Sequence, residues 1–193
     1  MARKLDRPVL SFKSAGGWER WLAKNHARAG AIWLRISKKD AREKSITYAE
    51  ALDEALCFGW IDSQKRAYDK SSWVQKFGPR KPASGWSKLN TAHAARLIKA
   101  GKMKPAGLKG IQAAKRDGRW RRAYDSPANA RVPADFMRAL NKSNKAKEFF
   151  KTLNRSNTYA IAYRLQTAKS AETRAKRMRA IIGMLAKGQK FHP

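Results

Sequence analysis

Seven side chains between positions 60 and 90 combine aromatic rings with charged and hydrogen-bonding groups. Aromatic rings can stack on a planar ligand, and Arg, Asp, Ser and Asn side chains can orient a polar or anionic one. The alternative interpretation is structural: Arg80 pairs with Asp62, and the Trp rings fill the junction between a sheet and its helices. We favour the structural interpretation and keep the pocket as the alternative. The candidate pocket residues are Trp60, Asp62, Phe77, Arg80, Trp86, Ser87 and Asn90.

No set of residues in the sequence has the spacing of a catalytic or metal site. The three histidines, His26, His93 and His192, lie far apart with few carboxylates near them, which disfavours a zinc or iron site. Cys57 is the only cysteine, so no internal disulfide can form, and on an apolar helix we expect an inert core residue. There is no Gly-rich phosphate loop with a trailing Lys. We predict no catalytic residue, no metal and no cofactor, and a binding protein rather than an enzyme.

Positive charge dominates the composition. The 44 Lys and Arg against 14 Asp and Glu give a net charge of +30, and residues 85–193 alone hold 26 basic and 5 acidic side chains, or +21. Such a field attracts polyanions, above all nucleic acid; the alternative is a surface that serves solubility only. We expect Lys and Arg to contact phosphates and the two aromatic candidates to stack on bases. The candidate nucleic-acid-binding residues are Lys99, Lys102, Lys104, Lys109, Lys115, Arg116, Arg119, Trp120, Arg121, Arg122, Tyr124, Arg174, Lys176, Arg177 and Arg179.

The N-terminal half alternates helical and strand patterns, and these elements must position the candidate pocket. Apolar residues at helical spacing predict a helix over residues 17–29 with Gly30 as its stop, and alternation over 31–37 predicts a strand. Thr47 and Glu50 have the spacing of a capping box, which opens a helix that Gly59 ends. Residues 60–68 and 72–77 are predicted to form an antiparallel hairpin.

The C-terminal half is predicted to be helical. A loop rich in Pro and Gly, residues 78–85, separates it from the strands, and helices follow over 86–100 and from Pro105 to the stop at Gly118. Ser143 and Ser156 are candidate N-caps of later helices. The fold class is therefore α+β, with a small antiparallel sheet packed with helices and an all-helical C-terminal half. The predicted division is an α+β domain over 1–125 and a helical C-terminal unit over 133–193.

The expected cellular location of the protein rests on the lack of a signal-peptide pattern and of a membrane-spanning stretch. The basic N-terminal residues precede no apolar run of signal-peptide length, and no stretch approaches the roughly 18 apolar residues of a spanning helix. We therefore expect a cytoplasmic protein.

Several short motifs occur in a characteristic order. They are ALCFGWID at 55–62, FGPR at 77–80, WSKLN at 86–90, GKMKPAGL at 101–108 and ETR at 172–174. In these segments the chain resembles the YdeI/OmpD-associated proteins, also described as bacteriocin-protection or OmdA-type proteins, over nearly its whole length. The resemblance implies a stress or bacteriocin-protection factor with an envelope or peptide partner.

Three functional hypotheses remain open. The leading one is a small basic cytoplasmic protein that binds nucleic acid or another polyanion without sequence specificity, since no motif for reading bases is present. The second is the protection factor, with the last amphipathic helix on an anionic membrane surface as a less favoured variant. The third is a small-ligand protein or enzyme that uses the cluster of Trp60, Asp62, Arg80 and Trp86. The sequence leaves the oligomeric state open.

Overall fold

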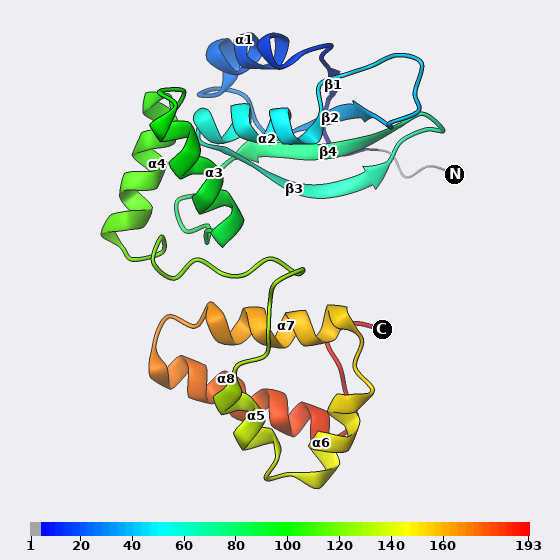
Figure 1. The fold of residues 1–193 in the computed structure, drawn as a ribbon, viewed down its shortest axis with the longest axis vertical. Helices are drawn as coiled ribbons and strands as arrows, with labels where there is room; N and C mark the ends of the chain where they lie inside the picture. The colour runs from blue at the N-terminus through cyan, green and yellow to red at the C-terminus, as the bar shows by residue number, and fades with distance from the viewer. Residues whose placement is uncertain (1–4) are drawn as a thin grey trace. The chain divides into compact units, whose positions relative to one another are not determined.

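The chain divides into two compact units. A computed structural model describes residues 5–193. The first unit, here called the sheet unit, consists of the chain up to Ser84 together with Ala92–Asp117. The second, the helical unit, consists of Gly85–Thr91 together with Gly118–Pro193. Figure 1 traces the elements of both units along the chain.

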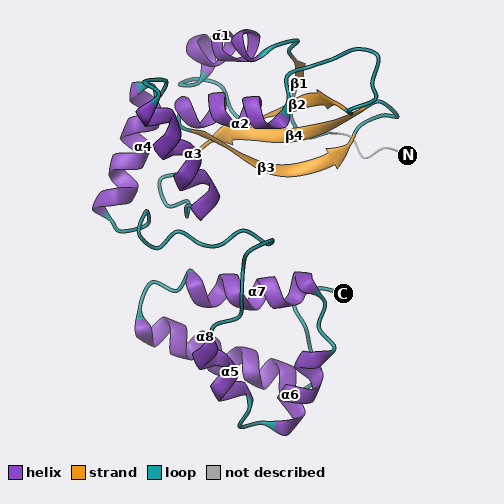
Figure 2. Ribbon diagram, viewed as in Figure 1, coloured by secondary structure: helices purple, strands orange, loops and turns teal. Residues whose placement is uncertain are grey.

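The sheet unit contains a four-stranded sheet in the order β1-β2-β4-β3 (Figure 2). The antiparallel neighbours are β2 (Ile32–Ser37), β4 (Ser72–Pro79) and β3 (Trp60–Ala67), which confirms the three predicted strands and the α+β class. A fourth strand, β1 (Val9–Ser11), was not predicted from the sequence and pairs with β2 in parallel. Three residues are too few to show a period of two, so the edge strand gave no signal of its own.

Two helices, α1 (Ala15–Asn25) and α2 (Tyr48–Cys57), cover one face of the sheet. The predicted capping box is present at α2: Thr47 Oγ1 accepts from the Glu50 amide at 3.3 Å, and the Glu50 carboxylate accepts from the Thr47 amide at 2.9 Å. Trp18 of α1 is fully buried and donates from its indole nitrogen to the Ala51 carbonyl of α2 at 3.1 Å. These helices and the inner face of β3 and β4 therefore share one core.

The helix ends show one confirmed prediction and one error. Gly59 has a φ of +73°, the left-handed conformation expected at the end of α2. The prediction that α1 continues to Ala29 was wrong, since the helix stops at Asn25. There the Asn25 side chain donates to the Trp21 carbonyl at 2.8 Å, and a ring nitrogen of His26 lies 2.9 Å from the Leu22 carbonyl. Just past them, the Arg28 and Ala29 amides both donate to the Asn25 carbonyl, at 3.0 and 2.8 Å, so the chain turns there instead of continuing the helix to the glycine.

Helices α3 (Lys88–Lys99) and α4 (Pro105–Arg116) follow the sheet, and Pro105 stands in the first turn of α4 as predicted. The start of α4 packs directly on the end of α2, where the Lys104 amide donates to the Cys57 carbonyl at 3.2 Å. The contact depends on Gly107, because a Cβ there would overlap the Cys57 carbonyl oxygen and lie 2.7 Å from the Leu56 carbonyl oxygen.

The helical unit contains α5 (Ala134–Leu140), α6 (Asn144–Lys151), α7 (Arg155–Gln166) and α8 (Ala171–Ala186). Ser143 caps α6 as predicted, but the cap of α7 is Asn154, whose side chain accepts from the Asn157 amide at 3.0 Å, and Ser156 lies inside that helix. The four helices share a core of Phe136, Leu140, Ala146, Ile161, Leu165, Ile181 and Leu185.

Asn157 ties the end of the chain to α7. It is 1% exposed, and its Oδ1 accepts from the amides of Phe191 and His192, each at 3.0 Å. These two amides follow the last helix and have no helical carbonyl as a partner, so the buried Asn157 side chain supplies their acceptor.

Within residues 5–193, none of the helices combines the length and the apolar character needed to cross a membrane. The same part of the chain holds no group of three or more His, Cys, Asp or Glu side chains placed to bind a metal ion.

Candidate functional site

Two of the candidate pocket residues belong to the core of the sheet unit. Trp60 is 1% exposed and Phe77 is 0% exposed. The Trp60 indole donates to the His26 carbonyl at 3.1 Å and crosses the rings of Trp18 and Trp21 edge-on, at centroid distances of 6.1 and 5.7 Å. The structure therefore places Trp60 and Phe77 where the structural interpretation expects them, with no ring face open to a ligand.

Asp62 lies beside Phe77 in the pairing of β3 with β4. Its Oδ2 accepts from the Tyr48 hydroxyl at 2.9 Å and from Gln75 Nε2 at 3.3 Å, and both donors are uncharged. Burial, followed by the charge and hydrogen bond of Asp62, raises the pKa of the Tyr48 phenol above its ordinary value. The Arg80 amide donates to the Gly59 carbonyl at 3.0 Å.

The remaining pocket candidates, Trp86, Ser87 and Asn90, belong to the helical unit. The Trp86 ring packs on Trp120 at a centroid distance of 5.0 Å, and the Ser87 hydroxyl accepts from the Asn90 amide at 3.1 Å at the start of α3. Tyr124 binds this segment on both sides, since its amide donates to the Trp86 carbonyl and its carbonyl accepts from the Lys88 amide. The seven candidates are thus divided between two units, and each of these three has a local structural role.

The basic candidates of the sheet unit lie on α3, on α4 and on the turn between them. Lys104 is half-buried and forms an ion pair with Glu19 at 3.0 Å, which raises the pKa of the lysine. The others carry exposed charges: Lys99, Lys102, Lys109, Lys115 and Arg116.

The two aromatic candidates are half-buried in the helical unit. Trp120 packs on Trp86, and Tyr124 meets the ring of Tyr163 edge-on at 4.9 Å. Their ring faces are therefore partly used by the protein itself. Among their cationic neighbours, Arg121 and Arg122 are exposed and Arg119 is half-buried.

The basic candidates on α8 are of two kinds. Arg174 forms a bidentate pair with Asp135, with Nη2 3.0 Å from Oδ1, and this pair lowers the pKa of the aspartate. Arg177 donates to the Arg164 carbonyl at 2.7 Å. Lys176 and Arg179 are exposed. The first two arginines stabilise the fold of the unit, whereas the last two are available to an anion.

A polar cavity of about 600 Å³ in the sheet unit was not anticipated from the sequence. Four cationic side chains line it: Lys13, Arg35, Arg42 and Lys44. They come from β2 and from the segments that follow β1 and β2, and no short motif unites them. The signal that the sequence offers for it is the density of charged residues over 38–44.

Two protein-family matches divide the chain, as the structure does, into an N-terminal and a C-terminal part. Residues 10–110 match a domain of unknown function, DUF8412, which covers more than half of the chain. The chain belongs to this family. Residues 129–188 match the family described as bacteriocin-protection, YdeI or OmpD-associated, which confirms the resemblance predicted from the sequence. That match lies within the helical unit, whereas the motifs between positions 55 and 108 fall in the domain of unknown function. Comparisons with curated proteins and with solved structures each found no match.

Proposed function

We propose that the protein binds nucleic acid without sequence specificity, through phosphate contacts from exposed Lys and Arg side chains of the helical unit. The observation that carries the proposal is the charge balance of this unit. It contains 19 Lys and Arg but only four Asp and Glu. A surface of this kind attracts a polyanion at long range and gains affinity by releasing counterions from it.

The four acidic side chains of the helical unit offset only a small part of this charge, and three of them do so in ion pairs with a basic side chain of the same unit. Asp125 binds Lys88 at 2.8 Å, Asp135 binds Arg174, and Glu148 binds Lys151 at 2.8 Å. With all four counted, the unit keeps a net charge of +15. The excess is larger than a domain of this size needs for solubility, for which a net charge of about 2 to 8 suffices.

The cations best placed to contact phosphates lie on α5, α6 and α8 and in the turn between the first two. They are exposed, and none has an ion-pair partner among residues 5–193. Helices α6 and α8 pack against each other, so their charges act on the same region of solvent. The set is Arg138, Lys142, Lys145, Lys147, Lys176 and Arg179.

The test is fluorescence anisotropy on two unrelated DNA duplexes and one single strand across a salt series. If about six phosphates are neutralised, log K falls with log salt at a slope near −5 on duplex DNA, and the two duplexes bind alike. The triple variant Lys145→Glu, Lys176→Glu, Arg179→Glu should weaken binding and flatten the slope. Arg174 and Arg177 stay unchanged in this variant because their contacts stabilise the fold.

The matched control is Lys24→Glu, Lys70→Glu, Lys81→Glu, which alters net charge equally on exposed positions of the sheet unit. It should retain most of the affinity. Circular dichroism checks that both variants remain folded. Absence of binding at low salt refutes the proposal, and an equal loss in both variants reduces it to an effect of total charge.

A second candidate function rests on the family match over residues 129–188, whose description names bacteriocin protection. In that case the helical unit binds a protein or peptide partner of the cell envelope. Survival of cells with and without the protein on exposure to a bacteriocin, compared with cells that carry the triple variant, tests this alternative. If the triple variant still protects the cells, the protective function does not depend on polyanion binding.

A further inference from the structure

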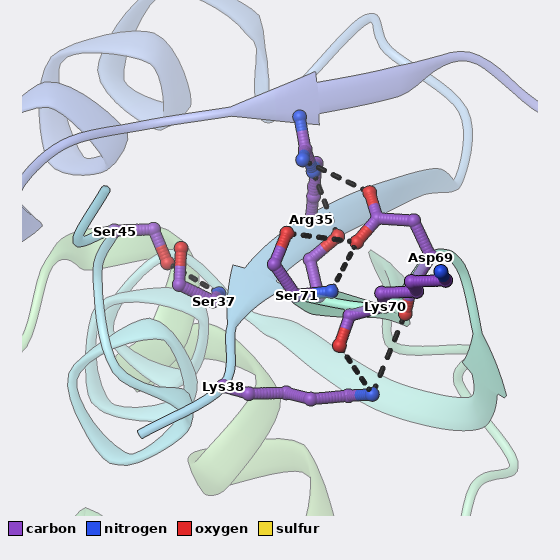
Figure 3. Close-up of polar contacts among 8 residues, drawn as sticks. Arg35, Ser37, Lys38, Ser45, Asp69, Lys70 and Ser71 are labelled. Atoms are coloured by element: carbon purple, nitrogen blue, oxygen red, sulfur yellow. Dashed lines mark hydrogen bonds and ion pairs between the residues drawn. The ribbon is translucent and has the colours of Figure 1, made fainter. Parts of the chain in front are cut away.

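The cavity in the sheet unit is lined by residues of β2, by the segments that follow β1 and β2, and by Ser71 in the turn that joins β3 to β4. Figure 3 shows Arg35, Ser37, Ser45 and Ser71 of this lining. Its lining has four cationic side chains, Lys13, Arg35, Arg42 and Lys44, against one carboxylate, that of Glu43. Four serines, Ser11, Ser37, Ser45 and Ser71, also line it. This combination of guanidinium, ammonium and hydroxyl groups is typical of sites that bind phosphate.

Arg35 is held in place before any ligand arrives. Its Nε donates to the Ser72 hydroxyl at 2.8 Å and its Nη2 to Asp69 Oδ2 at 2.9 Å. Asp69 is fixed in turn by the amide and the hydroxyl of Ser71, at 2.8 and 3.0 Å (Figure 3). Hydrogen bonds from Ser72 and Ser71 lower the pKa of Asp69 to about 2, so this carboxylate remains charged and keeps the arginine oriented.

The walls of the cavity are also joined by hydrogen bonds. The Lys38 amide donates to the Ser71 carbonyl at 2.8 Å, and Lys38 Nζ donates to the Lys70 carbonyl at 3.0 Å. On the opposite side, the Ser37 amide donates to the Ser45 hydroxyl at 2.8 Å, and the Ile46 amide donates to the Phe12 carbonyl at 2.9 Å. The loop after β2 is therefore anchored at both ends, and a ligand meets a cavity that is already formed.

Several donors in this cavity have no partner in the described part of the chain. Lys13 and Arg42 form no ion pair within residues 5–193, and the hydroxyls of Ser11 and Ser37 donate to no protein group there. Both cationic side chains, Lys13 and Arg42, are exposed. Each can therefore bind an anion without first breaking a contact with the protein.

We propose that this cavity binds a small phosphomonoester, with its phosphate group held by Lys13, Arg35 and Arg42. The net charge of the lining suits a dianion. The Arg42 guanidinium can offer paired N–H donors to phosphate oxygens, and Arg35 can add its Nη1 group, which neither Ser72 nor Asp69 binds. The volume is larger than one phosphate needs and lies in the range of small-molecule sites, about 300 to 1,000 Å³. Phe12 supplies an apolar wall for the rest of the molecule.

This site belongs to the sheet unit and uses none of the residues assigned to nucleic-acid binding. The two proposals therefore fail separately. The Glu variant of Lys145, Lys176 and Arg179 should bind a phosphomonoester as the unaltered protein does.

Isothermal titration calorimetry of the full chain with phenyl phosphate, at about 150 mM salt to screen exposed charges, tests the proposal. Phenyl sulfonate, a monoanion of similar shape, is the ligand control, and inorganic phosphate measures the phosphate group alone. We expect saturable one-to-one binding of phenyl phosphate, at least about tenfold tighter than phenyl sulfonate. The variant Lys13→Gln, Arg42→Gln should weaken it at least about tenfold, whereas Lys24→Gln, Lys81→Gln should change it by less than about twofold.

Two results overturn the proposal: an equal loss in both double variants, or no saturable binding of either phosphate ligand while duplex DNA still binds. If the first double variant is unfolded by circular dichroism, the single variant Arg42→Gln takes its place, because this exposed side chain makes no contact that the fold requires. Unchanged binding by a folded Arg42→Gln also counts against the site.

Discussion

The contact of α4 with α2 predicts opposite effects for the same substitution at two glycines of one helix. At Gly107, an added Cβ would overlap the Cys57 carbonyl oxygen and crowd that of Leu56 and the Met103 sulfur. At Gly110, three residues later, no other atom lies within 4 Å of the new Cβ. Gly107→Ala should therefore destabilise the sheet unit, and Gly110→Ala should stabilise it.

The magnitudes follow from two opposing terms. Overpacking a well-filled contact costs about 1 to 3 kcal/mol, and Gly107 belongs at the upper end because two of the obstructing atoms are backbone oxygens that cannot rotate away. Replacing Gly by Ala inside a helix contributes about 1 kcal/mol of stability. We expect a net loss of about 2 kcal/mol for Gly107→Ala and a gain of about 0.5 to 1 kcal/mol for Gly110→Ala.

Urea unfolding followed by Trp fluorescence measures both changes, because five of the seven Trp residues belong to the sheet unit. A difference of about 3 kcal/mol also separates the two melting temperatures by roughly 10 °C or more. If the two variants shift stability in the same direction, or differ by less than about 1 kcal/mol, α4 does not pack on the end of α2 through Gly107.

Three further predictions concern single side chains. Asn157→Ala leaves the amides of Phe191 and His192 without their acceptor, so urea unfolding should show a loss of about 2 to 4 kcal/mol in the free energy of unfolding. Limited proteolysis should also cut the last residues faster, and an intact tail would contradict this. Hydrogen bonds from Lys76 and then from Trp33 lower the pKa of Asp6 to about 2. Its contribution to stability is therefore complete above about pH 4 and disappears as the pH falls toward 2. The difference in unfolding midpoint between wild type and Asp6→Asn should vanish over that interval, and a constant difference would refute the assignment. Burial raises the pKa of the Cys57 thiol to about 12, so an aromatic disulfide reagent at pH 8 should label Cys57 only after denaturation, and rapid labelling of the native protein would show that the thiol is accessible.

Local patterns in the sequence were sufficient for most of the sheet unit. The capping box at Thr47 and Glu50 involves four consecutive residues, and the turn at Gly59 needs one backbone conformation, so both can be predicted without knowledge of distant contacts. The three antiparallel strands are six to eight residues long, and β2 lies within the segment whose alternation predicted it. The edge strand β1 is too short for alternation, and it depends on β2 for its hydrogen bonds.

The candidate site could be predicted only in part, because side-chain partners are set by tertiary contacts. Asp62 has Tyr48 and Gln75 as partners, and these lie 14 and 13 positions away on other elements. The phosphate cavity draws on four separate segments, around Lys13, Arg35, Arg42 and Ser71. Net charge, in contrast, is a property of composition, so the excess of Lys and Arg in the C-terminal half was evident from the sequence alone.

The segment Gly85–Thr91 has a consequence for how the protein is made. It belongs to the helical unit, yet the ribosome produces it before Ala92–Asp117, which complete the sheet unit. Domains generally fold from the N-terminus during synthesis, so the sheet unit can close while Trp86 still awaits Trp120 and Tyr124. During that interval an indole ring that is 3% exposed in the finished protein stands in water. A nascent chain in which Trp86 has left the ribosome before Trp120 and Tyr124 therefore exposes an apolar ring, and chaperone binding should be strongest at those lengths.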